Sequence, residues 1–260
     1  MLFAHISDFH VFAGEPGSPL VRRDFRPAFA KIIDDINAFD PAIEAVMFTG
    51  DLVDGGTAED YSLVKDIMSA LKMPYYSIPG NHDRRDTFRK AFENDLPFED
   101  DVFLHYETFF GNTRILALDT VIDGSAAGAL CPKRLDWIGE KLGTPHDGAT
   151  LILMHHAPYI SNLGFFDDIG LIEGRAAFAD LVRGFKGPTL RILSGHIHRP
   201  SFTCWNGAFA MIAGSPSFTV VLDLKAHTDE PPVFDAPYVY FVHSSEEPAQ
   251  FAVHPRLVRF

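Results

Sequence analysis

The sequence has little of several features that mark particular classes of protein. Its 260 residues include only two cysteines, Cys131 and Cys204, too few for a disulfide framework or a cysteine-based metal site. Basic residues are also outnumbered, because 22 Lys and Arg face 35 Asp and Glu and leave a net charge of −13. A chain this acidic lacks the positive field that polymeric nucleic acid requires, so we expect no such partner.

Targeting signals and long apolar runs are missing as well. The N-terminal stretch MLFAHISDFH has no basic region and reaches an acid at Asp8, which does not fit a signal peptide. No apolar run reaches the ~18 residues that a membrane span needs. We therefore expect no membrane partner, a cytoplasmic setting and two free thiols.

Apolar residues make up 47% of the chain and follow two alternating patterns up to about residue 200. Short β-rich runs such as LFAHIS, AVMFTG and YYSIP predict strands, and residues 25–39 and 58–71 place apolar side chains on one helical face. This alternation is typical of a layered α/β domain. Beyond residue 200, strand-like runs joined by Pro, Gly and Asp predict an antiparallel β extension. No linker separates it, so we expect one domain over residues 1–260.

Polar residues follow five of the predicted strands at the point where each strand ends. They are Asp8 and His10, Asp51 and Asp54, Asn81 to Asp83, His155 and His156, and His196 and His198. Ligands of open α/β sheets bind beyond the carboxyl ends of the strands, so these side chains should converge. A single histidine there is more often structural, but carboxylates together with imidazoles suit Mn, Fe, Co or Zn. The set is too large for one tetrahedral ion and predicts two ions that share a carboxylate.

The ordered motifs DFH, GDLVD, GNHD, HH and GHIH resemble those of the calcineurin-like metallophosphoesterases. Within that family they look most like the branch of class III cyclic nucleotide phosphodiesterases and glycerophosphodiesterases. The resemblance covers about residues 1–220. It implies a four-layer αββα sandwich of two mixed sheets, with a binuclear centre of divalent Mn, Fe, Zn or Co ions between them.

The resemblance also implies a role for each motif residue. One ion would be held by Asp8, His10, Asp51 and His198, and the other by Asp51, Asn81, His155 and His196. His82 would face the substrate phosphate, although a hydrogen bond to a neighbouring carboxylate is the alternative. His156 would support the site without binding an ion. Asp54 would fix His10 or cap its turn, and Asp83 would orient His82 or cap the next helix.

The reaction that follows is hydrolysis of a small phosphodiester, of the glycerophosphodiester or cyclic nucleotide type, by a hydroxide bridging the two ions. Asp51 would be essential as the shared ligand, and His82 would stabilise the phosphoryl oxygens and protonate the leaving group. The alternatives are a phosphomonoesterase, a nuclease, which the acidic charge disfavours, a phosphonate monoester hydrolase, or a protein-binding scaffold without catalysis.

Residues that would select the substrate are less clearly marked. Candidates are Arg22 and Arg23 in the loop after the first motif, and Asn162, Phe165 and Phe166 in the loop after His155. In the resembling diesterases a histidine often follows the GHxH motif and contacts the phosphate, but this chain has Ser217 there. That difference leaves open the choice among diesters, monoesters and phosphonate esters. Residues 200–245 would form a cap or a homo-oligomer contact, as in that branch, or an ordinary sheet edge.

Overall fold

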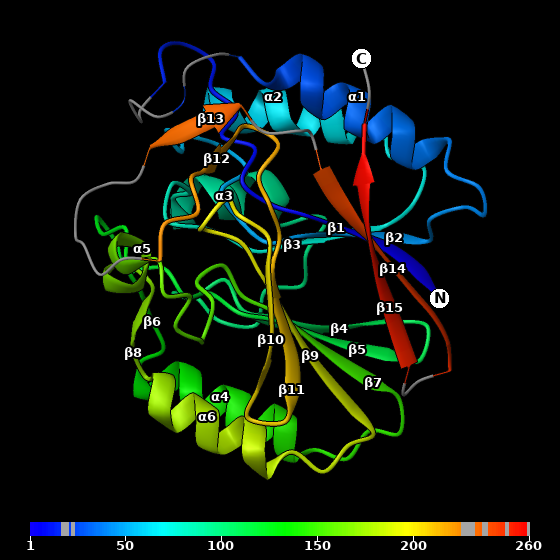
Figure 1. Ribbon diagram of the computed structural model, residues 1–260, viewed down its shortest axis with the longest axis vertical. Coiled ribbons are helices and arrows are strands. Elements are labelled where there is room, and N and C mark those ends of the chain that lie inside the picture. Colours follow the sequence, from blue (N-terminus) through cyan, green and yellow to red (C-terminus); the bar gives the residue numbers. More distant parts are fainter. Residues whose placement is uncertain (17–20, 22–23, 225–231, 236–238, 248–249, 259–260) are drawn as a thin grey trace.

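Two β-sheets lie face to face between two layers of helices in the computed structural model (Figure 1). The structure describes residues 1–16, 21, 24–224, 232–235, 239–247 and 250–258. The first sheet has the order β15 (Gln250–Leu257), β14 (Val239–Glu247), β1 (Leu2–Ile6), β2 (Ala45–Phe48) and β3 (Tyr75–Ser77). The second has the order β10 (Ser201–Trp205), β11 (Ala208–Ile212), β9 (Thr189–Ser194), β7 (Ala149–Leu153), β5 (Thr113–Ala117) and β4 (Tyr106–Phe110).

Helices cover the outer faces of both sheets (Figure 1). The first sheet carries α1 (Arg26–Asn37), α2 (Ala58–Met68) and α3 (Arg85–Phe92), and the second carries α4 (Pro132–Gly143) and α6 (Arg175–Gly184). Short elements complete the fold: α5 (Gly164–Asp168), the pair β6 (Gly128–Ala129) and β8 (Leu171–Glu173), and the pair β12 (Phe218–Val220) and β13 (Val233–Asp235). The predicted αββα sandwich of two mixed sheets is therefore confirmed.

The alternation of side chains along the strands separates two cores. On β7, Leu151 and Leu153 join the core that extends through the first sheet, whereas Ile152 packs with α4 and α6. On β5, Ile115 and Leu116 divide in the same way, as the period of two in a strand requires. Both faces of the second sheet are thus buried, which leaves the strand ends as the place where polar groups gather.

Local sequence signals place the helices that precede and follow the site. Thr57 and Asp60 form a capping box at the start of α2, in which each side chain accepts the backbone N–H of the other residue. Proline occupies the first turn of α1 and of α4, where its missing N–H costs no helical hydrogen bond. These signals explain why the helices begin where the strand-end loops finish.

The C-terminal extension divides between the two sheets. Strands β10 and β11 add to the second sheet, and β14 and β15 add to the first, beside β1. Most pairings of these strands are antiparallel, as expected. The exception is β11, which lies between β9 and β10 and runs antiparallel to β10 and parallel to β9. Tyr240 and Phe241 on β14 are buried because β14 is an inner strand of the first sheet. Phe202 on β10 is 51% exposed.

Both cysteines are free thiols, as the sequence predicted. Among the described residues, no helix combines the length and the apolar character needed to cross a bilayer.

Candidate metal centre

The strand-end motifs converge in one place, and an unusual backbone brings them there. In the described residues, seven non-glycine residues have a positive φ, and five of these are predicted metal ligands. They are Asp8, His10, Asp51, His196 and His198, with φ between 50° and 75°. Left-handed backbone is uncommon outside glycine and costs of order 1–3 kcal/mol per residue where it is strained. Such strain at five positions of one cluster indicates a functional constraint on the direction of these side chains.

Two glycines allow the loops to approach one another closely. A Cβ on Gly80 would lie 2.2 Å from Asp51 Oδ1, and one on Gly195 would lie 2.5 Å from Asp8 Oδ2. Any larger residue would therefore push a carboxylate out of the cluster. The GNHD turn therefore packs directly against the Asp51 side chain. Asp51 Oδ1 also accepts a hydrogen bond from the backbone N–H of His82 at 2.8 Å.

Each of the four histidines predicted as ligands has one ring nitrogen held by an oxygen outside the cluster. His10 Nδ1 lies 3.1 Å from Asp54 Oδ1, and His155 Nδ1 lies 2.7 Å from the Thr49 carbonyl oxygen. The corresponding contacts are 3.1 Å from His196 Nε2 to the Ile169 carbonyl and 3.2 Å from His198 Nδ1 to the Phe218 carbonyl. A carbonyl or carboxylate oxygen can only accept, so the held nitrogen carries the proton and the other nitrogen presents a lone pair.

The ring nitrogens that carry these lone pairs lie close to one another and to oxygen atoms in the centre of the site. His10 Nε2 and His198 Nε2 are 3.0 Å apart, and His198 Nε2 lies 3.4 Å from Asp8 Oδ1. On the other side, Asn81 Oδ1 lies 3.1 Å from His155 Nε2 and 3.0 Å from His196 Nδ1. Acceptors gathered so closely repel one another unless a cation lies among them, so the donor set fits metal ions.

Asp51 lies between the two groups. Its Oδ2 is 3.2 Å from His155 Nε2 and 3.8 Å from His10 Nε2, so one carboxylate oxygen faces both. Groups of three potential ligands within 4.8 Å of one another include Asp8 with His10 and His198, and Asp8 with Asp51 and His155. Asp51 therefore has the position that a ligand shared by two ions would require.

The electrostatics close to Asp51 favour positive charge, whereas burial lowers the pKa of His196 to about 3 and that of His198 well below its usual range. Burial lowers the pKa of His155, but the charge of Asp51 outweighs it and raises the pKa to about 9. Burial raises the pKa of Asp51, but His155 and His82 hold it well below the usual range. Asp8 shows the limit of this compensation, because burial and the nearby Asp51 raise its pKa to about 6. A site that attracts protons in this way would also attract a metal cation, which must displace them on binding.

His82 lies beside the cluster at the edge of a cavity. Its Nδ1 lies 3.1 Å from Asp54 Oδ1, the same oxygen that holds His10 Nδ1. Asp54 therefore fixes a predicted ligand and the predicted catalytic histidine together. The cavity has a volume of about 730 Å³, and its lining includes Asn81, His82 and the pair Arg84 and Arg85.

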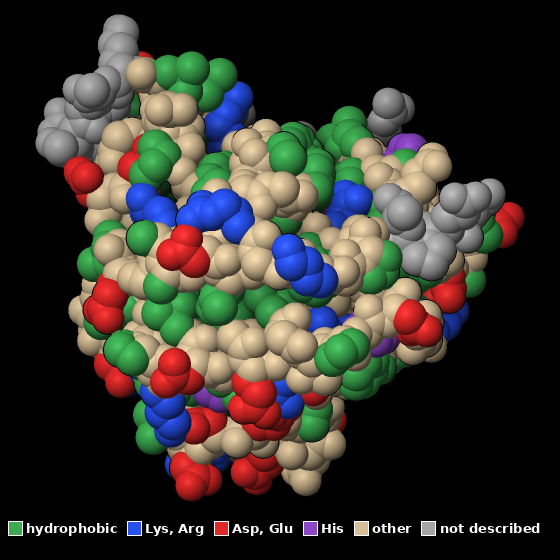
Figure 2. Space-filling model, turned by 90° about the horizontal axis from the view of Figure 1, so that it is seen from below, with side chains coloured by type: hydrophobic (Ala, Val, Ile, Leu, Met, Phe, Trp, Pro, Cys, Tyr) green, Lys and Arg blue, Asp and Glu red, His purple; other side chains and the backbone are tan. Residues whose placement is uncertain are grey.

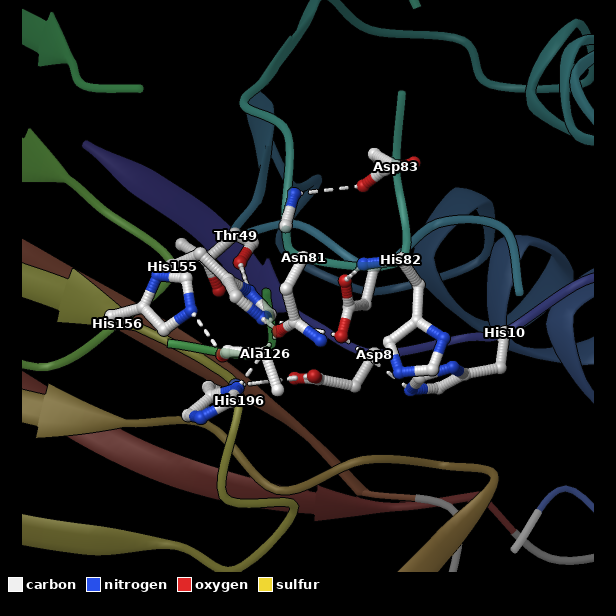
Figure 3. A network of polar contacts seen from close by, with 12 residues as sticks. Asp8, His10, Thr49, Asn81, His82, Asp83, Ala126, His155, His156 and His196 are labelled. Atoms are coloured by element: carbon white, nitrogen blue, oxygen red, sulfur yellow. Dashed lines mark hydrogen bonds and ion pairs between the residues drawn. The ribbon is translucent and has the colours of Figure 1, made fainter. Parts of the chain in front are cut away.

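Two neighbours of the ligands have roles that differ from a ligand's. His156 uses both nitrogens elsewhere. Its Nδ1 lies 2.8 Å from Thr120 Oγ1. Its Nε2 lies 3.0 Å from the Ala126 carbonyl oxygen (Figure 3). It supports the site without a free lone pair, as expected. Asp83 departs from both sequence expectations, because it accepts hydrogen bonds from the backbone N–H of Gly80 and from the Tyr61 hydroxyl. These hydrogen bonds stabilise the GNHD turn. Asp83 neither orients His82 nor caps α3.

The residues predicted to select the substrate are placed unevenly. Arg22 and Arg23 lie outside the described residues. Asn162 adopts a left-handed backbone. Phe165 packs edge-on against Phe166, and the ring centre of Phe166 lies 6.1 Å from that of His196. Ser217 is fully buried and bonds to Ser215 and to the Asp8 carbonyl. It therefore positions Asp8 from behind and is not available to a phosphate.

Sequence reasoning missed the backbone partners and the cationic side of the cavity. The carbonyl oxygens of Thr49, Ile169 and Phe218 carry no signal in the side-chain pattern, because any residue type supplies them. Arg84 and Arg85 directly follow the GNHD motif, so their position could have suggested a place near the substrate. Arg85 is paired with Asp119 and Asp123, whereas Arg84 is exposed.

Comparisons with known proteins agree with this geometry. The family model for calcineurin-like phosphoesterases matches residues 1–200. The chain is 33% identical over 247 residues to the probable glycerophosphodiester phosphodiesterase GpdQ of Arcobacter nitrofigilis, covering 95% of this chain and 90% of that one. It is 30% identical over 221 residues to the 3',5'-cyclic adenosine monophosphate phosphodiesterase CpdA of Pseudomonas aeruginosa, covering 85% and 77%. The purple acid phosphatase PPD1 of yellow lupin shares the fold, with a TM-score of 0.73 at 17% identity over 99% of this chain and 51% of that one.

Proposed function

The chain belongs to the calcineurin-like phosphoesterase family and is a metal-dependent phosphodiesterase, and we propose that it hydrolyses small phosphodiesters at a centre of two divalent ions. The observation that supports this most strongly is the set of four histidines, each with one nitrogen held by an oxygen and the other turned to Asp8, Asp51 or Asn81. One ion would be held by Asp8, His10, Asp51 and His198, and the second by Asp51, Asn81, His155 and His196.

Two bound divalent ions, of Mn, Fe, Zn or Co, would supply Lewis acidity and lower the pKa of a water molecule so that it can attack phosphorus. Asp51 would hold both ions at a fixed separation. Asp8 is oriented by the backbone N–H of His196, which lies 3.1 Å from both of its carboxylate oxygens, and by Ser215, which bonds to its carbonyl. The chain thus supplies a rigid frame for the reacting groups.

We propose that His82 contacts the phosphoryl group. Because Asp54 holds Nδ1, the nitrogen left for a ligand is Nε2. Burial lowers the pKa of His82, but the charge of Asp51 and the hydrogen bond to Asp54 raise it to about 10. Bound cations act against this shift because like charges repel. Nε2 would donate a hydrogen bond to a phosphoryl oxygen and pass its proton to the leaving alkoxide.

The cavity beside His82 supports a substrate of modest size. Its volume of about 730 Å³ lies within the range of ~300–1,000 Å³ that is usual for small-molecule sites. On the face shown in Figure 2, Lys and Arg side chains are interspersed with Asp and Glu and form no continuous patch. A polymer would need such a patch, so this face and the charge of −13 both favour a small diester over a nucleic acid.

The test compares a diester with a monoester on protein stripped of metal and reloaded with manganese. We expect kcat/KM for bis-p-nitrophenyl phosphate to exceed that for p-nitrophenyl phosphate at least tenfold, with Asp51→Ala as the blank. A preference for the monoester would overturn the diester proposal and identify a phosphomonoesterase on the same centre. A second comparison, between a glycerophosphodiester and 3',5'-cyclic AMP, then separates the two kinds of diester.

We also propose that the protein is a cytoplasmic homo-oligomer with a single domain over residues 1–260. Support for the oligomer comes from residues 200–245, where Leu222 and Leu224 are 54% and 63% exposed. Such an apolar stretch is more often covered than left in water. Sedimentation of the wild-type protein and of Leu222→Asp provides the test, since only the wild type should associate.

A further inference from the structure

A second cavity lies between the edges of the two sheets. It has a volume of about 610 Å³ and is bordered by β9, β10 and β11 on one side and by β14 and β15 on the other. Its walls are apolar and include Phe202, Phe209, Phe241, Phe251 and Val253. We call it the edge groove. None of the metal-centre residues lines it, so it is a separate site.

One cation, Arg191 of β9, lines this apolar groove. Arg191 is only 6% exposed, and its guanidinium carbon lies 4.2 Å from the ring centre of Phe209 and 4.8 Å from that of Phe251. Nη1 makes a long contact of 3.4 Å with the Phe251 carbonyl, and Nε is buried without a hydrogen-bond partner. Within the described part of the chain, no carboxylate pairs with this guanidinium.

A buried guanidinium without an anion is unusual. Charged groups taken out of water are normally paired, because an unmatched donor costs about 1–3 kcal/mol and more when it is charged. Burial lowers the pKa of Arg191 to about 10, so the side chain still carries its charge at neutral pH. The two rings stabilise the faces of the guanidinium but cannot accept the hydrogen bonds of its edge.

We propose that the edge groove binds an amphiphilic carboxylate, with its carboxylate paired to the edge of Arg191 and its acyl or aryl body against the phenylalanine wall. A guanidinium fixed between two rings presents its N–H groups in one plane, which matches the two oxygens of a carboxylate. The apolar walls favour a ligand with little other polarity, and the volume suits a medium-length chain. This inference is independent of the phosphodiesterase activity.

The first experiment measures binding of decanoate, decanol and decyltrimethylammonium to the manganese-loaded protein by calorimetry. We expect decanoate to bind at least tenfold more tightly than decanol, and the cation not to bind. In Arg191→Met the preference for decanoate over decanol should fall to about one. Equal binding of decanoate and decanol by the wild type would overturn the proposal, as would decanoate binding that Arg191→Met leaves unchanged.

A second pair of variants keeps the test valid if Arg191→Met folds poorly. Phe202 on the groove and Phe109 on β4 are both 51% exposed, so they form a matched pair of surface phenylalanines. Phe202→Asp should weaken decanoate binding at least tenfold, while Phe109→Asp should bind as the wild type does. Equal effects of the two changes would overturn the proposal. So would sedimentation showing that Phe202→Asp dissociates a wild-type oligomer, because the groove would then be an interface between copies.

Discussion

Two groups of buried histidines in this molecule look alike in burial and differ in what surrounds them. The histidines of the metal centre each have one nitrogen held by an oxygen and the other turned towards Asp8, Asp51 or Asn81. His5 and His243, on β1 and β14, are equally inaccessible, but both nitrogens of His243 and Nδ1 of His5 have no partner. Burial by itself therefore does not mark a metal site.

The second pair is a packing feature of the first sheet. His243 stacks on Phe3 with ring centres 4.5 Å apart, and His5 reaches Thr49 Oγ1 at 2.9 Å. Burial lowers the pKa of His5 to about 3 and holds that of His243 well below its usual range, so both rings are neutral. What separates the histidines of the metal centre is a held proton on one nitrogen and a carboxylate or amide oxygen near the other.

The sharpest test of the comparison removes the shared carboxylate. Asp51→Ala should lower kcat/KM by ~10³-fold or more, because both ions lose a ligand and each factor of ten corresponds to about 1.4 kcal/mol. Metal content by mass spectrometry should fall from two ions per chain. Normal turnover with two ions bound would contradict the assignment of Asp51 as the bridge.

Removing the proposed acid should affect catalysis without emptying the centre. His82→Ala should reduce kcat by about 10²–10⁴-fold, the range typical of a lost general acid, while two ions stay bound. The reduction should be smaller for a substrate with a good leaving group, such as p-nitrophenolate, than for an alkoxide. Loss of metal in this variant would show that His82 is a ligand.

His155 and His156 are adjacent in the sequence but have different predicted roles, the first as a metal ligand and the second as a supporting residue. His155→Ala should remove an ion, since its Nε2 faces Asn81 and Asp51. His156→Asn should keep both ions and lower metal affinity by only about 10–100-fold, as changes to supporting groups usually do. Equal metal loss in both variants would contradict the distinction drawn from their hydrogen bonds.

Substitution of His243, whose ring nitrogens have no hydrogen-bond partner among the described residues, should stabilise the protein and leave its function intact. His243→Leu replaces a ring whose two nitrogens are unsatisfied, so we expect the free energy of unfolding to rise by about 1–3 kcal/mol. Activity and metal content should match the wild type. Destabilisation in urea unfolding would mean that His243 has polar partners after all.

The smallest effect is on pH dependence. In the unfolded chain His5 and His243 take up protons near pH 6.5, whereas burial prevents this in the folded state. Stability should therefore fall as pH drops below about 6.5, and less steeply in His243→Leu. Urea unfolding with a chelator, between about pH 7.5 and 4.5, compares the two slopes. The charges of Arg191 and His254 also disfavour protonation of His243 in the folded state. Equal slopes of stability against pH in the wild type and in His243→Leu would contradict the contribution of His243.

The sequence by itself determined many of the strands, the helices within residues 25–39 and 58–71, and the residues at the strand ends. Periods of two and of 3.6 are local properties. In GHIH, His196 and His198 have left-handed backbone, and in GNHD the glycine Gly80 leaves room for Asp51. For that reason the convergence of Asp8, Asp51 and the histidines could be predicted from their positions alone.

Only the tertiary structure decided which atoms these residues meet. The carbonyls that hold His155, His196 and His198 belong to distant segments, and their residue types give no sign of the contact. The hydrogen bond from the Tyr61 hydroxyl to Asp83 also could not be read from the sequence. Nor could the position of Arg191 in a groove between strands that are far apart in the chain. Backbone oxygens and sheet edges become partners through strand order, and strand order depends on the packing of the whole chain.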